Sequence, residues 1–401
     1  MTKRFLIKKS DLIVLISLFI ASFVSIVAGC IFFLFFIFVS RKITDLAFIF
    51  PIFVISVIAF TQYTTDMQGD YDILRYYMHY YVLSDCGIKD GLAYIFLLGD
   101  YFFYIIVFII SKIVPADPRF FSFFFSLLTG MIMLSSYKEI VHYCETNRKM
   151  SSCYRPINMF VWVFGFVCII SIVNYTNIVR QFFSFSLFIL AVARHMNGKH
   201  WIIFLIFAML SHWSMIMYAI LYFIGSKYPR TLLKCCAIAF VFGFLDISAI
   251  VANFSDRAAA FFTDEEILGV DKTLMLILFL SLLMVIYVLS KIDTDEKKLS
   301  VIMYSILFLD AFFLFRSSLA TRFYYNFTQY LTILFPIMIS SGKIFKKNTA
   351  SLFMIITFGL IMFYNVKQII LADFSYQIFS PYSILDSAIT IFSAPFPTEM
   401  L

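Results

Sequence analysis

Three arginines stand apart from the basic clusters of the sequence, and arginine is well suited to binding phosphate. Arg180 precedes Gln181 at the start of an apolar run, and Arg316 and Arg322 flank a short polar stretch. A guanidinium stays charged and presents a planar fork to phosphate oxygens. The arginines and Gln181 therefore predict a pyrophosphate-binding site. The alternative for Arg180 is a side chain that reaches toward lipid headgroups.

Two residues near the later arginines extend this pattern. Tyr325 follows Arg322 by three positions, so the two side chains share a helix face and Tyr325 can orient a sugar or a phosphate. Asp310 lies six residues before Arg316 in an apolar run. We interpret Asp310 as a structural partner of an arginine.

His212 lies in the middle of a long apolar segment, between Ser211 and the pair Trp213-Ser214. An ionisable side chain in such a segment is a candidate functional residue by default. Its imidazole would serve as a general base, as an ion relay or as a hydrogen-bonded structural group. The sequence alone leaves these three roles open.

The stretch over residues 63–90 combines carboxylates with tyrosines. Asp66, Asp70 and Tyr71 begin it, and more tyrosines follow. Aromatic faces stack on sugar rings and carboxylates accept hydrogen bonds from sugar hydroxyls, so we predict an external substrate loop here. Asp70 and Asp66 are alternative general bases to His212, and Tyr71 is a substrate-binding residue. The competing interpretation is an interfacial aromatic belt with solvated acids.

The composition restricts the class of protein that carries these residues. Of 401 residues, 62% are hydrophobic and only 14% are charged, with a mean hydropathy of +0.93. A soluble domain has about 25% charged residues. The composition excludes a soluble enzyme and a nucleic-acid-binding module, and the net charge of +7 is ordinary for a membrane protein with basic cytoplasmic loops. No Walker loop or zinc signature occurs, so we expect neither a metal nor another cofactor.

Twelve apolar runs are long enough to be membrane-spanning helix candidates. We therefore predict an all-α polytopic membrane protein with 11–12 transmembrane helices in one membrane domain over residues 1–401. The runs lie near residues 12–39, 46–62, 91–114, 119–137, 158–174, 178–193, 201–226, 232–253, 272–290, 299–315, 322–340 and 351–370.

Lys and Arg set the expected orientation, because they concentrate in cytoplasmic loops. The tail 371–401 has neither residue and is predicted to be external. Both 194–200 and 227–234 are basic, yet only 201–226 separates them. That segment is either one tilted span or a broken, re-entrant helix whose halves meet at His212.

Several short motifs together resemble the EpsG family. They are the sequence from Asn177 to Gln181, the turn Gly198-Lys199, and Ala208 followed by His212. Asp70-Tyr71 and Tyr76 resemble an early motif of that family, and Arg322 with Tyr324-Tyr325 resembles a late one.

The resemblance implies a Wzy-type polymerase of O-antigen or capsular polysaccharide in the bacterial inner (cytoplasmic) membrane. Such an enzyme transfers a growing glycan from undecaprenyl pyrophosphate to another lipid-linked repeat unit on the external face. Its partners would be undecaprenyl-pyrophosphate-linked oligosaccharides, membrane lipids and a chain-length regulator, with no nucleic acid. A repeat-unit flippase or transporter, and a membrane acyltransferase, are the alternatives.

Overall fold

The computed structural model describes residues 46–60, 63–64, 72–114, 117, 119–148, 178–228, 272–289 and 374–375, together with isolated positions elsewhere. These residues are almost entirely helical, as predicted. Strands β1 (Tyr63–Thr64) and β2 (Phe374–Ser375) are the exception, and they pair in antiparallel register with Tyr63 opposite Ser375. This pairing joins the start of the C-terminal tail to the start of the predicted substrate loop.

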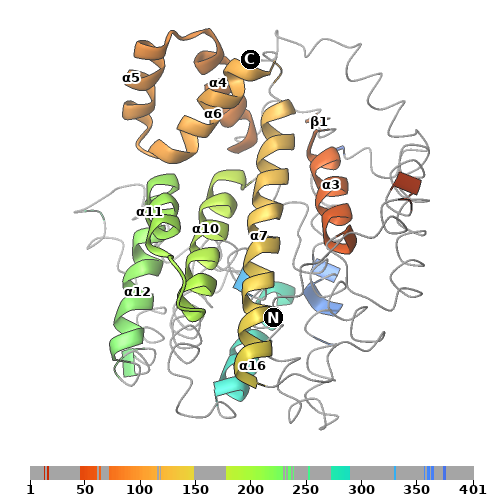
Figure 1. Ribbon diagram of the computed structural model, residues 1–401, viewed down its shortest axis with the longest axis vertical. Coiled ribbons are helices and arrows are strands. Elements are labelled where there is room, and N and C mark those ends of the chain that lie inside the picture. The colour runs from red at the N-terminus through yellow and green to blue at the C-terminus, as the bar shows by residue number, and fades with distance from the viewer. Residues whose placement is uncertain are drawn as a thin grey trace.

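The longest described helix is α7 (Arg119–Arg148), which spans roughly 45 Å at 1.5 Å per residue. Its part Arg119–Cys144 is the one helix, within the described ranges, that is long and apolar enough to cross a membrane. Helix α3 (Leu46–Phe60) packs along α7 (Figure 1). A Cβ atom on Gly130 would collide with the side chain of Ile52, so this glycine lets the two helices approach closely.

Helix α7 extends beyond the apolar run predicted for residues 119–137. Polar residues from Lys138 to Arg148 continue the helix, and no Pro or Gly interrupts them. Hydropathy follows only the apolar part of a helix, so the prediction ended too early.

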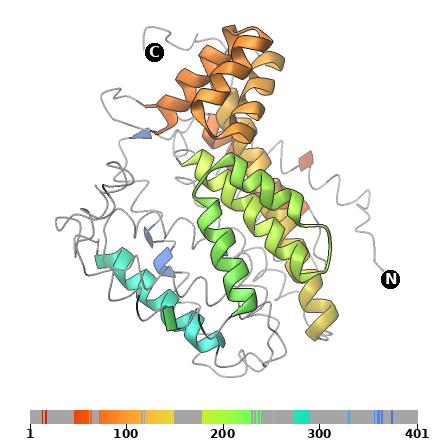
Figure 2. The same cartoon turned by 90° about the vertical axis from the view of Figure 1, so that its left-hand side faces the viewer.

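Three helices gather at one end of the molecule, shown in orange in Figures 1 and 2. They are α4 (Asp72–Asp85), α5 (Ile88–Leu98) and α6 (Tyr101–Ile113). We call them the cap. The predicted substrate loop 63–90 is therefore helical from Asp72 to Asp85 and again from Ile88 onward.

The prediction of one span over residues 91–114 is wrong. Helix α5 ends at Gly99, whose φ of 82° is a left-handed conformation that favours glycine, and α6 begins directly after Asp100. Hydropathy is continuous across this point because both flanking segments are apolar. The break places a carboxylate at a helix junction.

The segment 201–226 is broken, and its two halves turn back. Helix α11 (Ile202–Ser211) ends at His212, which has an extended backbone, and α12 (Met215–Lys227) follows. Trp201 at the start of α11 packs against Phe223 near the end of α12, with ring centroids 5.5 Å apart. The two helices therefore form a hairpin (Figure 2), as one of the two predicted alternatives required.

Helix α10 (Val179–Met196) lies between this hairpin and α7 and is buried along almost its whole length. At its far end, Gly198 has a φ of 67° and opens a tight turn into α11. The next residue, Lys199, pairs with Glu139 of α7 at 2.7 Å. Asn197 donates to the backbone oxygen of Glu139, so this turn is fixed to α7. A further apolar helix, α16 (Lys272–Leu289), agrees with the predicted run 272–290.

Candidate functional site

The centre of the site is an ion pair between Arg180 and Asp100. Arg180 lies in the first turn of α10, and Asp100 is the junction between α5 and α6. The Arg180 Nη1 atom donates to the Asp100 Oδ2 atom at 2.6 Å. The Asp100 side chain is 8% exposed and the Arg180 side chain 28% exposed. A short charge-assisted bond of this kind fixes the guanidinium while leaving part of it accessible.

Two buried tyrosines of the cap complete the surroundings of Arg180. The Tyr76 ring on α4 lies 5.8 Å from the guanidinium carbon, within the range of a cation–π contact. The Tyr104 hydroxyl on α6 accepts a hydrogen bond from Arg180. The Nε atom of Arg180 is buried and has no hydrogen-bond partner among the described residues. A buried donor without a partner is costly, so this edge of the guanidinium has unused capacity for an anion.

Asp100 also holds the tip of the α11–α12 hairpin. Its carboxylate accepts a hydrogen bond from the backbone N–H of Trp213. The ring of Phe102, two residues after Asp100, stacks on Phe207 of α11 with centroids 4.2 Å apart. Burial raises the pKa of Asp100, while Arg180 and the Trp213 N–H act in the opposite direction. Asp100 therefore joins the cap, α10 and the hairpin.

The hairpin tip also fixes the proton of His212. The backbone N–H of Ser214 donates to His212 Nδ1 at 3.2 Å, and the Ser214 hydroxyl lies 3.0 Å from the same atom. A backbone N–H only donates, so Nδ1 is the acceptor and the neutral ring carries its proton on Nε2. His212 is therefore held in place at Nδ1, and its role as a general base stays a prediction.

The structure describes three of the residues predicted for the site. Arg180 and His212 belong to one region, because Asp100 contacts Arg180 directly and contacts Trp213, the neighbour of His212. Gln181 is half-buried beside Arg180 in the first turn of α10. The remaining predicted residues lie outside the described ranges: Asp66, Asp70, Tyr71, Arg316, Arg322 and Tyr325.

Asp100 and Tyr104 were missing from the sequence prediction. A signal for Asp100 was present, since an ionisable residue inside an apolar run is a functional candidate. The signal is weak because the hydropathy of residues 91–114 is continuous and predicts one uninterrupted span. Tyr104 carries no comparable signal, because an isolated tyrosine in an apolar helix is common.

The comparison with known families decides the family of the chain. The model of the EpsG family matches residues 47–384, which is most of the chain and includes both Asp100 and Arg180. The chain belongs to the EpsG family. The predicted resemblance is confirmed, and this membership associates the protein with membranes and with polysaccharide biosynthesis. No curated protein and no solved structure matches the chain.

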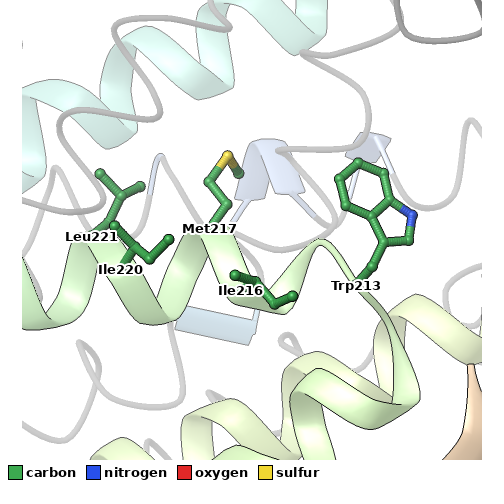
Figure 3. Close-up of a pocket in the computed structure, with 5 residues that line it drawn as sticks. All are labelled: Trp213, Ile216, Met217, Ile220 and Leu221. Carbon is green, nitrogen blue, oxygen red and sulfur yellow. The ribbon is translucent and has the colours of Figure 1, made fainter. Parts of the chain in front are cut away.

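In this EpsG-family protein an apolar groove begins at the site and follows α12 (Figure 3). It has a volume of about 350 Å³ and starts at Trp213, whose side chain is 70% exposed. The other lining residues are Ile216, Met217, Ile220 and Leu221. These four residues recur at helical spacing, so they share one face of α12.

In the described part of this EpsG-family chain, no three or more His, Cys, Asp or Glu side chains are grouped to hold a metal ion. The polar groups at the site are instead a guanidinium, a carboxylate, tyrosine hydroxyls and imidazoles. These groups bind anions and sugars and transfer protons.

Proposed function

We propose that this EpsG-family protein is a membrane glycosyltransferase that polymerises lipid-linked polysaccharide repeat units. It transfers the growing glycan from undecaprenyl pyrophosphate to the non-reducing end of another lipid-linked repeat, on the external face of the membrane. The product is an O-antigen-type or capsular polysaccharide. The observation that carries the proposal is Arg180, held by Asp100 beside the tip of a helix hairpin.

The transfer exchanges one bond for another. The acceptor hydroxyl oxygen attacks the anomeric carbon of the donor, and the bond from that carbon to the pyrophosphate oxygen breaks. The pyrophosphate leaves with the bonding electrons, and the hydroxyl proton goes to a base. Negative charge grows on the departing oxygen, and a preorganised cation stabilises that charge. Because the pyrophosphate is the leaving group, the reaction needs no nucleotide sugar.

Of the three arginines predicted for the site, Arg180 is the one whose position the structure describes. Asp100 neutralises part of its charge but also prevents the side chain from rotating, so the remaining guanidinium edge has a fixed direction. Fixed donors cost no reorganisation during the reaction. We assign Gln181, the neighbour of Arg180, to the same leaving group.

The predicted residues outside the described ranges keep their proposed roles. Arg316 and Arg322 would add positive charge to the pyrophosphate site. Tyr325 and Tyr71 would orient sugar or phosphate, and Asp70 or Asp66 would bind sugar hydroxyls or take a proton. Each role follows from the chemistry of the side chain and from its match to a family motif.

The arrangement of the basic residues supports an external site. The turn with Arg194 and Lys199 lies at the end of α10 opposite Arg180, and the hairpin returns Lys227 to that same end. Lys and Arg mark the cytoplasmic side. The cap and Arg180 would then face outward, and we propose a multi-pass protein of the bacterial inner membrane.

The apolar groove on α12 supports a lipid-linked substrate. A polyprenyl chain is apolar throughout, and its pyrophosphate would lie at the Trp213 end, next to the Arg180 region. A groove of this kind would bind the lipid by burying apolar surface. Other partners in the proposal are membrane lipids and a chain-length regulator.

A gel of surface polysaccharide tests the proposal in cells. The gene is deleted and complemented with wild type, with Arg180→Ala or with Arg194→Ala, a matched control at the other end of α10. We expect deletion to convert the polymer ladder into a single exported repeat. Wild type and Arg194→Ala should restore the ladder, whereas Arg180→Ala should not. Loss of even the single repeat would indicate a flippase or transporter. An unchanged ladder in the deletion strain would contradict the polymerase proposal. A polymer that had lost only an acyl group would indicate an acyltransferase.

A further inference from the structure

His79 on α4 belongs to the same side-chain network as Arg180. Its ring packs edge-to-face on Tyr104, with centroids 5.3 Å apart at an interplanar angle of 81°. Tyr104 in turn accepts a hydrogen bond from Arg180. His79 and Tyr76 are three residues apart on α4, so both face the guanidinium. An imidazole therefore lies one side chain away from the proposed pyrophosphate site.

A hydrogen bond fixes one nitrogen of the His79 ring. Nδ1 lies 2.8 Å from the Tyr94 hydroxyl of α5. When Nδ1 donates its proton to the Tyr94 oxygen, the lone pair lies on Nε2. Within the described residues, Nε2 of His79 has no hydrogen-bond partner, and the side chain is only half-buried. A substrate hydroxyl can therefore reach it.

We propose that His79 is the general base of the transfer reaction. Its Nε2 atom takes the proton of the acceptor hydroxyl as that oxygen bonds to the anomeric carbon, while the carbon–pyrophosphate bond breaks. The product is an imidazolium and the free lipid pyrophosphate, and the imidazolium then returns its proton to water. This assignment rests on the proposed glycosyltransferase function and deepens it.

The other candidate bases are less suitable in the structure. His212 accepts a backbone N–H at Nδ1, which leaves its proton on Nε2. Asp100 is almost fully buried and already accepts bonds from Arg180 and from the Trp213 N–H. His79 combines partial exposure with an available nitrogen. Tyr94 is then a positioning residue that holds the ring at Nδ1.

The electrostatic surroundings keep His79 neutral. Burial lowers the pKa of His79 below 6.5, and Arg180 and Arg75 lower it further. A neutral imidazole at physiological pH is the form that accepts a proton. The titratable and charged groups that act on the ring are Arg75 of α4, Tyr94 of α5, Tyr104 of α6 and Arg180 of α10. Arg180 in turn contacts Tyr76 and Asp100.

The test uses the purified full-length protein with lipid-linked repeat units, measured from pH 5 to 9 for wild type, His79→Gln, His212→Gln and Tyr94→Phe. For wild type we expect kcat to be level at neutral and alkaline pH and to fall only on the acid side of the ordinary histidine range, because the pKa of His79 is lowered. His79→Gln should lower kcat by about 10²–10⁴-fold, leave KM unchanged and abolish the acid limb. Tyr94→Phe should lower kcat less and retain the limb.

Wild-type kcat in His79→Gln, or a low kcat with the acid limb retained, would overturn the assignment. Equal thermal midpoints and equal binding of the lipid-linked donor separate a catalytic defect from misfolding. An acid limb that disappears in His212→Gln instead would transfer the role to His212. Failure of the wild-type protein to polymerise would count against the proposed function itself, which distinguishes the two failures.

Discussion

Asp100 and Arg180 are separated by 80 positions in the sequence and form an ion pair of 2.6 Å. The pair joins the cap to the first turn of α10, and Asp100 also accepts the Trp213 N–H at the hairpin tip. Three elements from distant parts of the chain therefore meet at one carboxylate.

Replacing Arg180 with Lys should impair polymerisation although the charge is kept. A lysine ammonium cannot donate to Asp100, to Tyr104 and to a pyrophosphate in one fixed plane. Loss of one charge-assisted hydrogen bond, about 1.5–3 kcal/mol, corresponds to roughly a 10–100-fold lower rate. The lower rate can be measured on gels of surface polysaccharide and as kcat of the purified protein. Full polymer from Arg180→Lys would contradict the phosphate-binding role.

Asp100→Asn should reduce both stability and activity. The amide keeps the shape of the side chain, but Arg180 loses its counter-charge in a largely buried site. Removing one partner of a buried pair costs about 3–5 kcal/mol, and the 28% exposure of Arg180 places the expected cost at the low end. A lower thermal midpoint in detergent and at least a tenfold loss of polymer are expected. Asp90→Asn, at an exposed position of α5, is the control and should change neither.

Gly99→Ala tests whether the α5–α6 junction must place Asp100 accurately. The φ of 82° strains any residue with a Cβ atom, by about 1–2 kcal/mol, although no atom lies within 4 Å of the added methyl group. Gly198→Ala has the same type of strain, at a φ of 67°, at the opposite end of α10. Both variants should lower the thermal midpoint similarly, but Gly99→Ala should reduce kcat more. Equal kcat values would show that the junction is not part of the site.

Ile220→Asn tests the proposed lipid groove. Ile220 is 51% exposed on the grooved face of α12, and a polar side chain there would disfavour an apolar chain. KM should rise several-fold for a donor with a long polyprenyl chain and stay constant for a donor with a short prenyl chain. Ile203→Asn, at a position 52% exposed on α11, is the matched control. An equal rise in KM for both donors would exclude the groove as the lipid site.

The sidedness of the cap can be measured through Cys86, which is half-buried between α4 and α5. In a protein that keeps only this cysteine, a membrane-impermeant maleimide should react in spheroplasts. A cysteine introduced as Lys199→Cys, at the opposite end of α10, should react only after permeabilisation. The reverse pattern would place the cap in the cytoplasm and contradict an external reaction.

Part of this arrangement was predictable from the sequence. Basic residues on both sides of 201–226 conflict with a single span, and a hairpin removes the conflict by returning Lys227 to the end that carries Lys199. The importance of Arg180 was also predictable, because a lone arginine at the start of an apolar run needs a partner. The local pattern of charge and hydropathy was sufficient in both cases.

The partner of Arg180 was not predictable in the same way. Periodicity and hydropathy describe neighbours in the sequence, whereas Asp100 reaches Arg180 only because α5 ends at Gly99 and the cap folds onto α10. The proton position on His212 likewise depends on the backbone N–H of Ser214, which the order of residues does not reveal. Long-range contacts and backbone geometry decided both features.

Chain elongation by the purified protein tests the central claim most directly. Wild-type protein in lipid vesicles receives only lipid-linked repeat units, without nucleotide sugar or ATP, and glycan length and free undecaprenyl pyrophosphate are measured together. The account predicts a ladder with one lipid pyrophosphate released for each bond formed, and neither product from Arg180→Ala. Vesicles that form no ladder, or an Arg180→Ala protein that forms the same ladder, would contradict it.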